Sequence, residues 1–167
     1  MKKKTKRKDV YKPHYSAVEI AMASTTQPMP KEHRDVQLAN MRRGLENLRS
    51  AAEATPDDWR MVSDCVNLLE TFVVNGWVED GVEEGDGFIR DAEKALAEAG
   101  TRAMEGKPLR LDGPGLEACE AAILAYEAVI GEISQRNLRL AINQTERRVR
   151  AILAGRPAPH DAPTIRL

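Results

Sequence analysis

Acidic residues gather in the middle of the chain, where their spacing comes close to that of a calcium-binding loop. If Asp80 is position 1 of such a loop, glycine occupies position 6 and Asp91 occupies position 12. Position 3, however, is Val82, whose side chain has no oxygen with which to ligate calcium. We therefore interpret the stretch as an acidic surface between helices that binds a basic partner. Its acids are Glu79, Asp80, Glu83, Glu84, Asp86 and Asp91.

Basic residues gather near the two ends of the chain. Those of the opening stretch are Lys2, Lys3, Lys4, Lys6, Arg7 and Lys8, followed by Lys12. Near the other end, the spacing of Arg136, Arg139, Arg147 and Arg150 places them close to one face of a helix. Arginine binds phosphate through paired hydrogen bonds, so both groups are candidate phosphate-binding residues. The alternative is a solvated face, or one that pairs with the acidic middle of this chain or of another copy.

No catalytic or cofactor motif accompanies these charges. The glycines at 81, 85, 87, 113 and 115 lack the preceding strand that a nucleotide-binding loop requires. His14, His33 and His160 stand far apart, and none is paired with a carboxylate at a metal-binding spacing. The serines and cysteines show no nucleophile arrangement that a sequence can reveal. We therefore expect a protein that is not an enzyme and that holds no metal and no cofactor.

The composition favours an intracellular helical protein. Ala, Leu, Glu and Arg dominate and aromatic residues are only 4% of the 167, which favours helices over strands. Cys65 and Cys119 fall among apolar positions, so we expect buried, reduced thiols. No apolar run reaches the ~20 residues of a membrane span, and no apolar stretch follows the basic opening as in a signal peptide. These features predict a cytoplasmic protein with no membrane partner.

Charge is segregated along the chain although its net value is −1. Residues 1–12 hold seven cations and one acid, whereas residues 76–132 hold five cations and fourteen acids. Residues 133–167 return to seven cations and two acids. A basic–acidic–basic chain indicates charged partners or self-association.

Apolar residues recur with a helical period from about residue 31 onward. A stripe of Leu38, Met41, Leu45 and Leu48 predicts a first helix over about 31–54. Thr55 and Pro56 start a second, strongly apolar helix that Gly76 ends, and we place it at the centre. An alanine-rich third helix ends near residues 104–106. Residues 114–154 form either one long helix whose basic half projects, or two helices separated near Gly131.

These segments predict an all-α fold. We expect an antiparallel bundle of four helices, or five if the last one breaks, over residues 31–155. Residues 1–30 are expected to form a disordered, basic, flexible arm, and residues 156–167 a flexible tail.

The order of the segments resembles that of small all-helical proteins of unknown function encoded by phages and prophages of proteobacteria. Those proteins open with a Lys/Arg-rich stretch that leads into a Y-x-P-like segment, as residues 6–13 do here. A Leu/Met helix like 36–52 follows, then an apolar helix of the type "VSDCVNLLETFVVNGW". An alanine-rich helix like 92–104 precedes a last helix that ends in Arg-rich sequence, like 114–154. The resemblance implies an accessory protein of a phage or mobile element, but no site residues.

Three functions follow as hypotheses. The first is a non-enzymatic protein of a phage or mobile element that binds a host protein in the bacterial cytoplasm and inhibits a host defence system. The second is a nucleic-acid-binding protein that uses the basic arm and the Arg-rich helix. The third is a self-assembling structural protein, in which the basic ends of one copy pair with the acidic middle of another to form a homo-oligomer.

Overall fold

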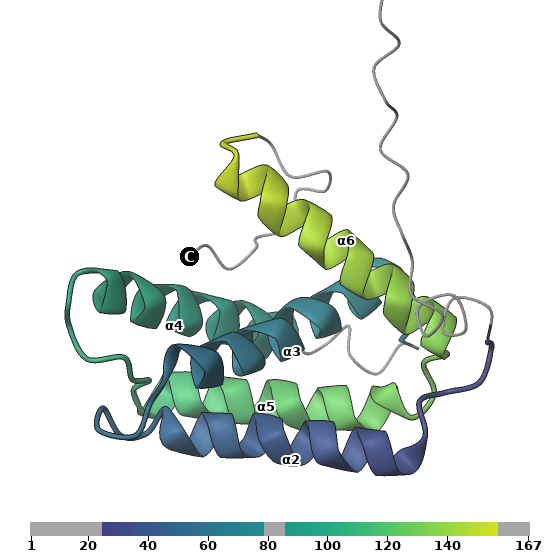
Figure 1. The fold of residues 1–167 in the computed structure, drawn as a ribbon, viewed down its shortest axis with the longest axis horizontal. Coiled ribbons are helices and arrows are strands. Elements are labelled where there is room, and N and C mark those ends of the chain that lie inside the picture. Colours follow the sequence, from purple (N-terminus) through teal and green to yellow (C-terminus); the bar gives the residue numbers. More distant parts are fainter. Residues whose placement is uncertain (1–24, 79–85, 157–167) are drawn as a thin grey trace, which may run out of the picture.

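Five α-helices make up most of the described chain in the computed structural model (Figure 1). The structure describes residues 25–78 and 86–156. The helices are α2 (Lys31–Asn47), α3 (Pro56–Val74), α4 (Asp86–Met104), α5 (Gly113–Ile130) and α6 (Gln135–Leu153). Within the described ranges the β-structure is limited to an isolated bridge between Pro28 and Ser134. The prediction of an all-α fold is confirmed.

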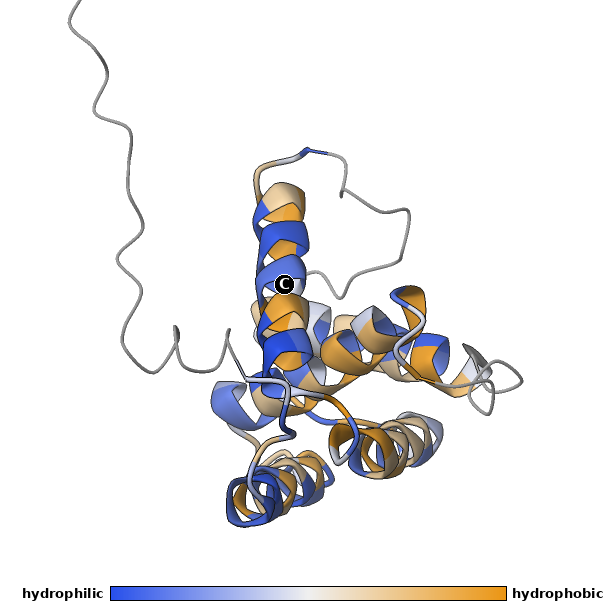
Figure 2. Ribbon diagram, turned by 90° about the vertical axis from the view of Figure 1, so that its right-hand side faces the viewer, coloured by the Kyte–Doolittle hydropathy of each residue, from blue (hydrophilic) through white to orange (hydrophobic). Residues whose placement is uncertain are grey.

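Helices α2 to α5 form the bundle, and α6 is added to it at an angle (Figure 1). α2 packs against α3 and α5, α4 packs against the same two helices, and α3 also touches α5. α3 contacts each of the other four helices, as its apolar sequence predicts. Its fully buried side chains are Val62, Cys65, Val66, Leu69 and Phe72. Figure 2 shows α6 rising from the bundle as a separate helix.

The first helix ends earlier than its apolar stripe predicts. α2 stops at Asn47, and residues 48–53 form turns instead of continuing to about residue 54. The carbonyl oxygen of Leu48 accepts a hydrogen bond from the backbone N–H of Leu111 at 2.9 Å. In a continuing helix that oxygen would accept from the residue four positions later. A tertiary contact therefore ends the helix, while the Leu48 side chain stays completely buried.

The ends of α3 follow local sequence signals. The Thr55 hydroxyl accepts a hydrogen bond from the Asp58 backbone N–H at 3.2 Å, and the Asp58 carboxylate accepts from the Thr55 N–H at 3.0 Å. This reciprocal capping box satisfies two backbone donors that the helix leaves free, and Pro56 takes the first helical position. Beyond the other end, Gly76 has a φ of 62°, in the left-handed region that glycine adopts without strain.

Small residues allow α4, the alanine-rich helix, to approach α5 closely. A Cβ added at Gly115 of α5 would lie only 2.8 Å from the Cβ of Ala95 on α4. Trp59 of α3 covers the other side of α4, where its indole Nε1 donates to the carbonyl oxygen of Leu96 at 2.9 Å. Ala92 and Ala99 of α4 and Ala122 of α5 are fully buried.

The long C-terminal segment is broken into two helices. After α5, Ser134 caps the new helix by accepting a hydrogen bond from the Asn137 backbone N–H at 3.1 Å. α6 then runs at an angle to the bundle, and its C-terminal half projects (Figure 1). Two backbone N–H groups of its first turn donate to the carbonyl oxygens of Thr25 and Gln27. The start of α6 is thereby tied to the residues that precede α2.

Both cysteines are buried free thiols, as predicted. Burial raises the pKa of Cys119 to about 12. Burial also raises the pKa of Cys65, with a smaller contribution from its neighbours Cys119 and Asp64. Neither side chain is therefore a thiolate near neutral pH, so neither has the reactivity of a catalytic cysteine.

Candidate functional site: a cleft and a polar network beneath α6

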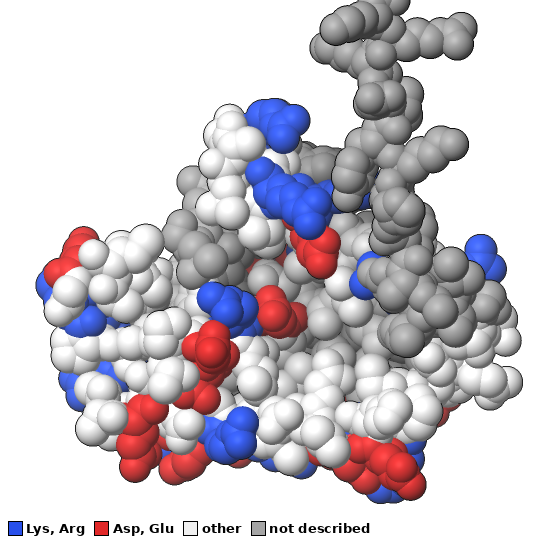
Figure 3. Space-filling model, viewed as in Figure 1, with Lys and Arg blue, Asp and Glu red and all other residues white. Residues whose placement is uncertain are grey.

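The four arginines selected from the sequence lie together on α6. Arg136, Arg147 and Arg150 are exposed and Arg139 is half-buried. Arg150 donates to the carboxylate of Glu146 at 3.1 Å, one turn earlier on the helix. Figure 3 shows Lys and Arg on the projecting helix, and Asp and Glu interspersed with Lys and Arg over the bundle below it. The cations of the opening stretch, Lys2, Lys3, Lys4, Lys6, Arg7 and Lys8, lie outside the described residues.

The acidic surface selected from the sequence falls mostly outside the described residues. Glu79, Asp80, Glu83 and Glu84 belong to the undescribed range 79–85. Asp86 is the first residue of α4, and Asp91 is exposed one turn later on the same helix.

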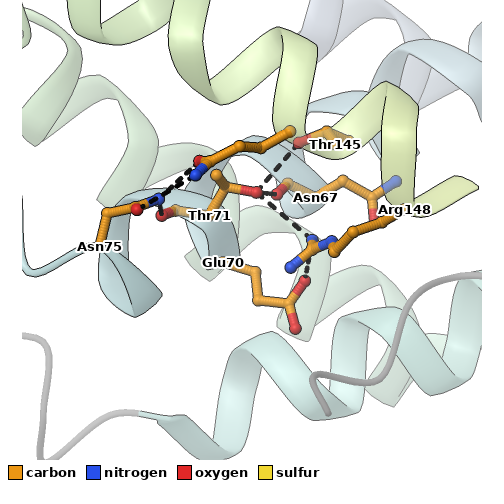
Figure 4. A network of polar contacts seen from close by, with 7 residues as sticks. Asn67, Glu70, Thr71, Asn75, Thr145 and Arg148 are labelled. Carbon is orange, nitrogen blue, oxygen red and sulfur yellow. Dashed lines mark hydrogen bonds and ion pairs between the residues drawn. The ribbon is translucent and has the colours of Figure 1, made fainter. Parts of the chain in front are cut away.

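A polar network that the sequence analysis missed joins α6 to α3 (Figure 4). The Arg148 side chain is buried and donates to the Glu70 carboxylate at 2.6 Å and to the Thr71 hydroxyl at 3.3 Å. The Thr71 hydroxyl lies 2.8 Å from the carbonyl oxygen of Asn67 and 3.0 Å from the Thr145 hydroxyl. A hydroxyl has a single hydrogen, so Thr71 donates to the carbonyl and Thr145 donates to Thr71.

An amide pair extends the network along both helices. The Asn75 Nδ2 donates to the Gln144 Oε1 at 2.8 Å and to the Thr71 carbonyl oxygen at 2.6 Å. The buried residues of α6 are Leu138, Ala141, Thr145 and Arg148, two of them apolar and two polar. The position of α6 on the bundle is therefore set by polar contacts as much as by apolar packing.

Glu93 of α4 adds a second carboxyl group beside Glu70. Its side chain is buried, and the two carboxyl groups are hydrogen bonded to each other. Burial, followed by the charge of Glu70, raises the pKa of Glu93 to about 8. Burial also raises the pKa of Glu70, while the Arg148 guanidinium opposes that rise. At neutral pH the pair shares one proton, so that Glu93 donates to a Glu70 carboxylate that also accepts from Arg148.

Four buried polar atoms on the same three helices have no hydrogen-bond partner among the described residues. They are Ser63 Oγ, Asn67 Oδ1, Glu93 Oε1 and Arg148 Nε. An unpaired buried polar atom costs about 1–3 kcal/mol. Buried ion pairs commonly add less stability than apolar side chains of the same size. We infer that the network serves to fix the position of α6 rather than to maximise stability.

A cleft of about 440 Å³ opens between α2, α3 and α6. Its apolar lining consists of Met41, Met61, Leu68 and Ile142. Asp64 of α3 and Glu146 of α6 are exposed on two of its walls, and Thr145 lies deeper on the α6 wall. Figure 3 shows this face of the molecule hollowed beneath α6. Because Thr145 is hydrogen bonded to Thr71, the network also sets the position of the α6 wall.

The polar groups of the cleft are rich in hydrogen-bond acceptors. Gln37 donates its Nε2 to the Tyr126 hydroxyl at 3.2 Å, which leaves its buried Oε1 without a partner among the described residues. Asp64 is partly desolvated by the surrounding helices, which raises the pKa of its carboxyl group. The Arg60 charge opposes this rise and the Glu146 charge adds to it. Carboxylate and amide oxygens beside thioethers suit a ligand that combines a cation with an apolar part.

The sequence contained a partial signal for the network. Arg148 follows Thr145 by three residues and Ala141 by seven, which places it on the buried stripe and apart from Arg147 and Arg150. Its partner Glu70, 78 positions earlier in the chain, could not be identified without the tertiary structure.

Within the described ranges, no three His, Cys, Asp or Glu side chains are placed to hold a metal ion. No helix there is both long enough and apolar enough to span a bilayer. Comparison with known proteins gave no matching family model, no matching curated protein and no matching solved structure. The cleft and the network are therefore interpreted from their own chemistry.

Proposed function

We propose that this chain is a non-enzymatic binding protein that engages a host protein, and that the cleft beneath α6 is its partner-binding site. The observation that carries the proposal is the apolar, acceptor-rich cleft whose α6 wall is positioned by a buried polar network. The resemblance to accessory proteins of phages and prophages supports a host protein as the partner, including a defence complex of the bacterial cytoplasm.

The surface around the cleft supports a protein rather than a small molecule alone. α6 also exposes Leu153, which is 63% exposed and shares the helix face of Ile142 and Glu146. Exposed apolar side chains on the face that borders an apolar cleft are typical of interaction surfaces. A protein partner would bury both the cleft and part of α6, as an interface of ordinary size requires.

Affinity purification from host cells tests this proposal. The tagged protein is compared with a variant that carries Asp64→Lys and Glu146→Lys, which reverses the charge of the two exposed walls. Glu98→Lys is the matched control, because Glu98 is exposed on α4, a helix that does not line the cleft. We expect a stoichiometric host protein with the wild type and the control, and its loss with the cleft variant. Equal recovery with all three proteins would refute the site, and a partner-free wild type would refute the function.

A second function, nucleic-acid binding, is favoured by one observation. Arg136, Arg139, Arg147 and Arg150 share one face of the projecting helix. If they bind phosphates, affinity for a random duplex falls steeply between 50 and 200 mM salt. Arg147→Gln with Arg150→Gln would reduce the slope of log affinity against log salt by about 2, since two phosphate contacts are removed. Absence of binding at 50 mM salt would rule this function out.

A further inference from the structure

Two carboxylates on two different helices present hydrogen-bond acceptors to the cleft, which the buried Gln37 Oε1 of α2 does not reach. On α3, Asp64 has neither a hydrogen bond nor an ion pair in the described part of the chain. On α6, the Glu146 carboxylate accepts from Arg150, in an ion pair whose two side chains are 52% and 76% exposed. A pair exposed to that extent is easily exchanged for another cation.

The charges of the cleft favour a cation further. Arg60 is held by Asp57 on its own helix at 2.9 Å, whereas Arg150 pairs with Glu146 itself and is the group that an incoming cation displaces. Asp64 and Glu146 repel each other across the opening, and this repulsion contributes to the raised pKa of Asp64. A positive group bound between them would relieve the repulsion. Its hydrogen bonds would replace those to the water that both carboxylates give up when the group binds.

The apolar lining determines what must accompany the cation. Met41, Met61, Leu68 and Ile142 form a surface on which an aliphatic chain can lie. The volume of about 440 Å³ falls within the range of sites that enclose a whole ligand. A bare metal ion or ammonium ion would leave this lining uncovered.

We infer that the cleft receives an arginine side chain of the partner protein, with its aliphatic stem on the methionine-lined floor and its guanidinium between Asp64 and Glu146. The guanidinium has five N–H donors in a fixed plane, enough to serve both carboxylates together. A lysine ammonium has three donors at one point and serves separated acceptors less well. This inference rests on the proposed function and specifies the chemistry of the partner.

Titration of the full-length protein with butylguanidinium tests the cleft without any partner. The probe has the head and stem of arginine, and butylurea is its neutral counterpart of the same shape. Methionine methyl NMR signals report directly, because Met41 and Met61 line the cleft whereas Met104 is exposed at the end of α4. We expect butylguanidinium to shift the Met41 and Met61 signals and to bind at least about tenfold more tightly than butylurea.

A double variant, Asp64→Asn with Glu146→Gln, should weaken butylguanidinium binding by at least about tenfold. Both side chains are exposed, so the variant is expected to keep its fold, and Glu98→Gln is the control that should bind as the wild type does. Equal binding of butylguanidinium and butylurea would overturn the inference. A Met104 shift as large as those of Met41 and Met61 would overturn it too.

The tripeptide acetyl-Leu-Arg-Leu-amide identifies the source of the cation. A partner protein predicts that the tripeptide binds more tightly than butylguanidinium, because the flanking leucines cover more of the apolar lining. Exclusion of the tripeptide while butylguanidinium binds would mean that the cleft takes a free small cation, which contradicts the inference. If a host protein is captured through the cleft but butylguanidinium does not bind, the arginine site is refuted and the proposed function stands. If butylguanidinium binds in the cleft but no host protein is captured, the proposed function is refuted and the arginine site stands.

Discussion

Replacement of Glu93 by glutamine should make the protein more stable, and increasingly so as the pH rises. Glu93 lies buried beside Glu70 and Arg148, and its carboxyl group is hydrogen bonded to that of Glu70. The glutamine amide can donate the same hydrogen bond as the protonated acid, has nearly the same shape and does not ionise. The variant therefore removes the titration while it keeps the contact.

The expected magnitude follows from the pKa of Glu93, which burial and the Glu70 charge raise from 4.5 to about 8. A carboxyl group with a raised pKa in the folded state contributes stability that is complete below pH 4.5 and is lost as the pH rises towards 8. Each pH unit within this window changes the free energy of unfolding by about 1.4 kcal/mol. The wild type should therefore lose on the order of 3 kcal/mol relative to Glu93→Gln between pH 5 and 7.5.

Urea unfolding followed by far-ultraviolet circular dichroism, at intervals between pH 5 and pH 8, measures this difference. Groups that titrate alike in both proteins cancel in the comparison. Asp91→Asn, on the exposed side of the same helix, should follow the wild type at every pH. If the stabilities of the wild type and Glu93→Gln change in parallel with pH, the shared-proton description of the pair is wrong.

Three further comparisons, each measured by urea unfolding, test the packing of the fold. Arg148→Met should lower the free energy of unfolding by about 3–5 kcal/mol, because it leaves buried carboxyl groups without their cation. Adding Glu70→Leu to this variant should restore most of the lost stability. If it restores none, the ion pair between Glu70 and Arg148 is contradicted. Gly115→Ala should cost about 1–3 kcal/mol because its Cβ would lie 2.8 Å from a side chain of α4. Gly113→Ala, where a Cβ meets nothing within 4 Å, should change stability by less than about 0.5 kcal/mol, and equal effects of the two would refute the close approach. Thr55→Ala should cost about 1 kcal/mol through loss of the cap, and an unchanged stability would show that the capping box contributes nothing.

Local signals explain which parts of the fold the sequence could predict. The start of α3 depends on Thr55, Pro56 and Asp58, which act on one another within a single turn. The end of α3 depends on Gly76, which adopts the left-handed backbone conformation that closes the helix. By contrast, α2 ends early because Leu48 bonds to Leu111, a residue far away in the chain. A contact of that kind leaves no periodic trace in the sequence.

The candidate site shows the same division. The spacing of the α6 arginines was sufficient to place them on one face, because helical geometry alone decides it. The network required Glu70, Glu93 and Arg148 to meet from three helices, and α3, α4 and α6 come together only through the packing of the bundle. The cleft depends on the angle of α6, which follows from the break near Ser134. The sequence left open whether that break occurs.

Photo-crosslinking in host cells tests the central claim most directly. A photoreactive phenylalanine analogue replaces Asn40, which lines the cleft, or Glu117, which is exposed on α5. If the cleft binds a host protein, light should produce one discrete covalent adduct from position 40 and none from position 117. An adduct from position 117 alone, or none from position 40 in cells where the tagged protein captures its partner, would contradict the placement of the binding site beneath α6.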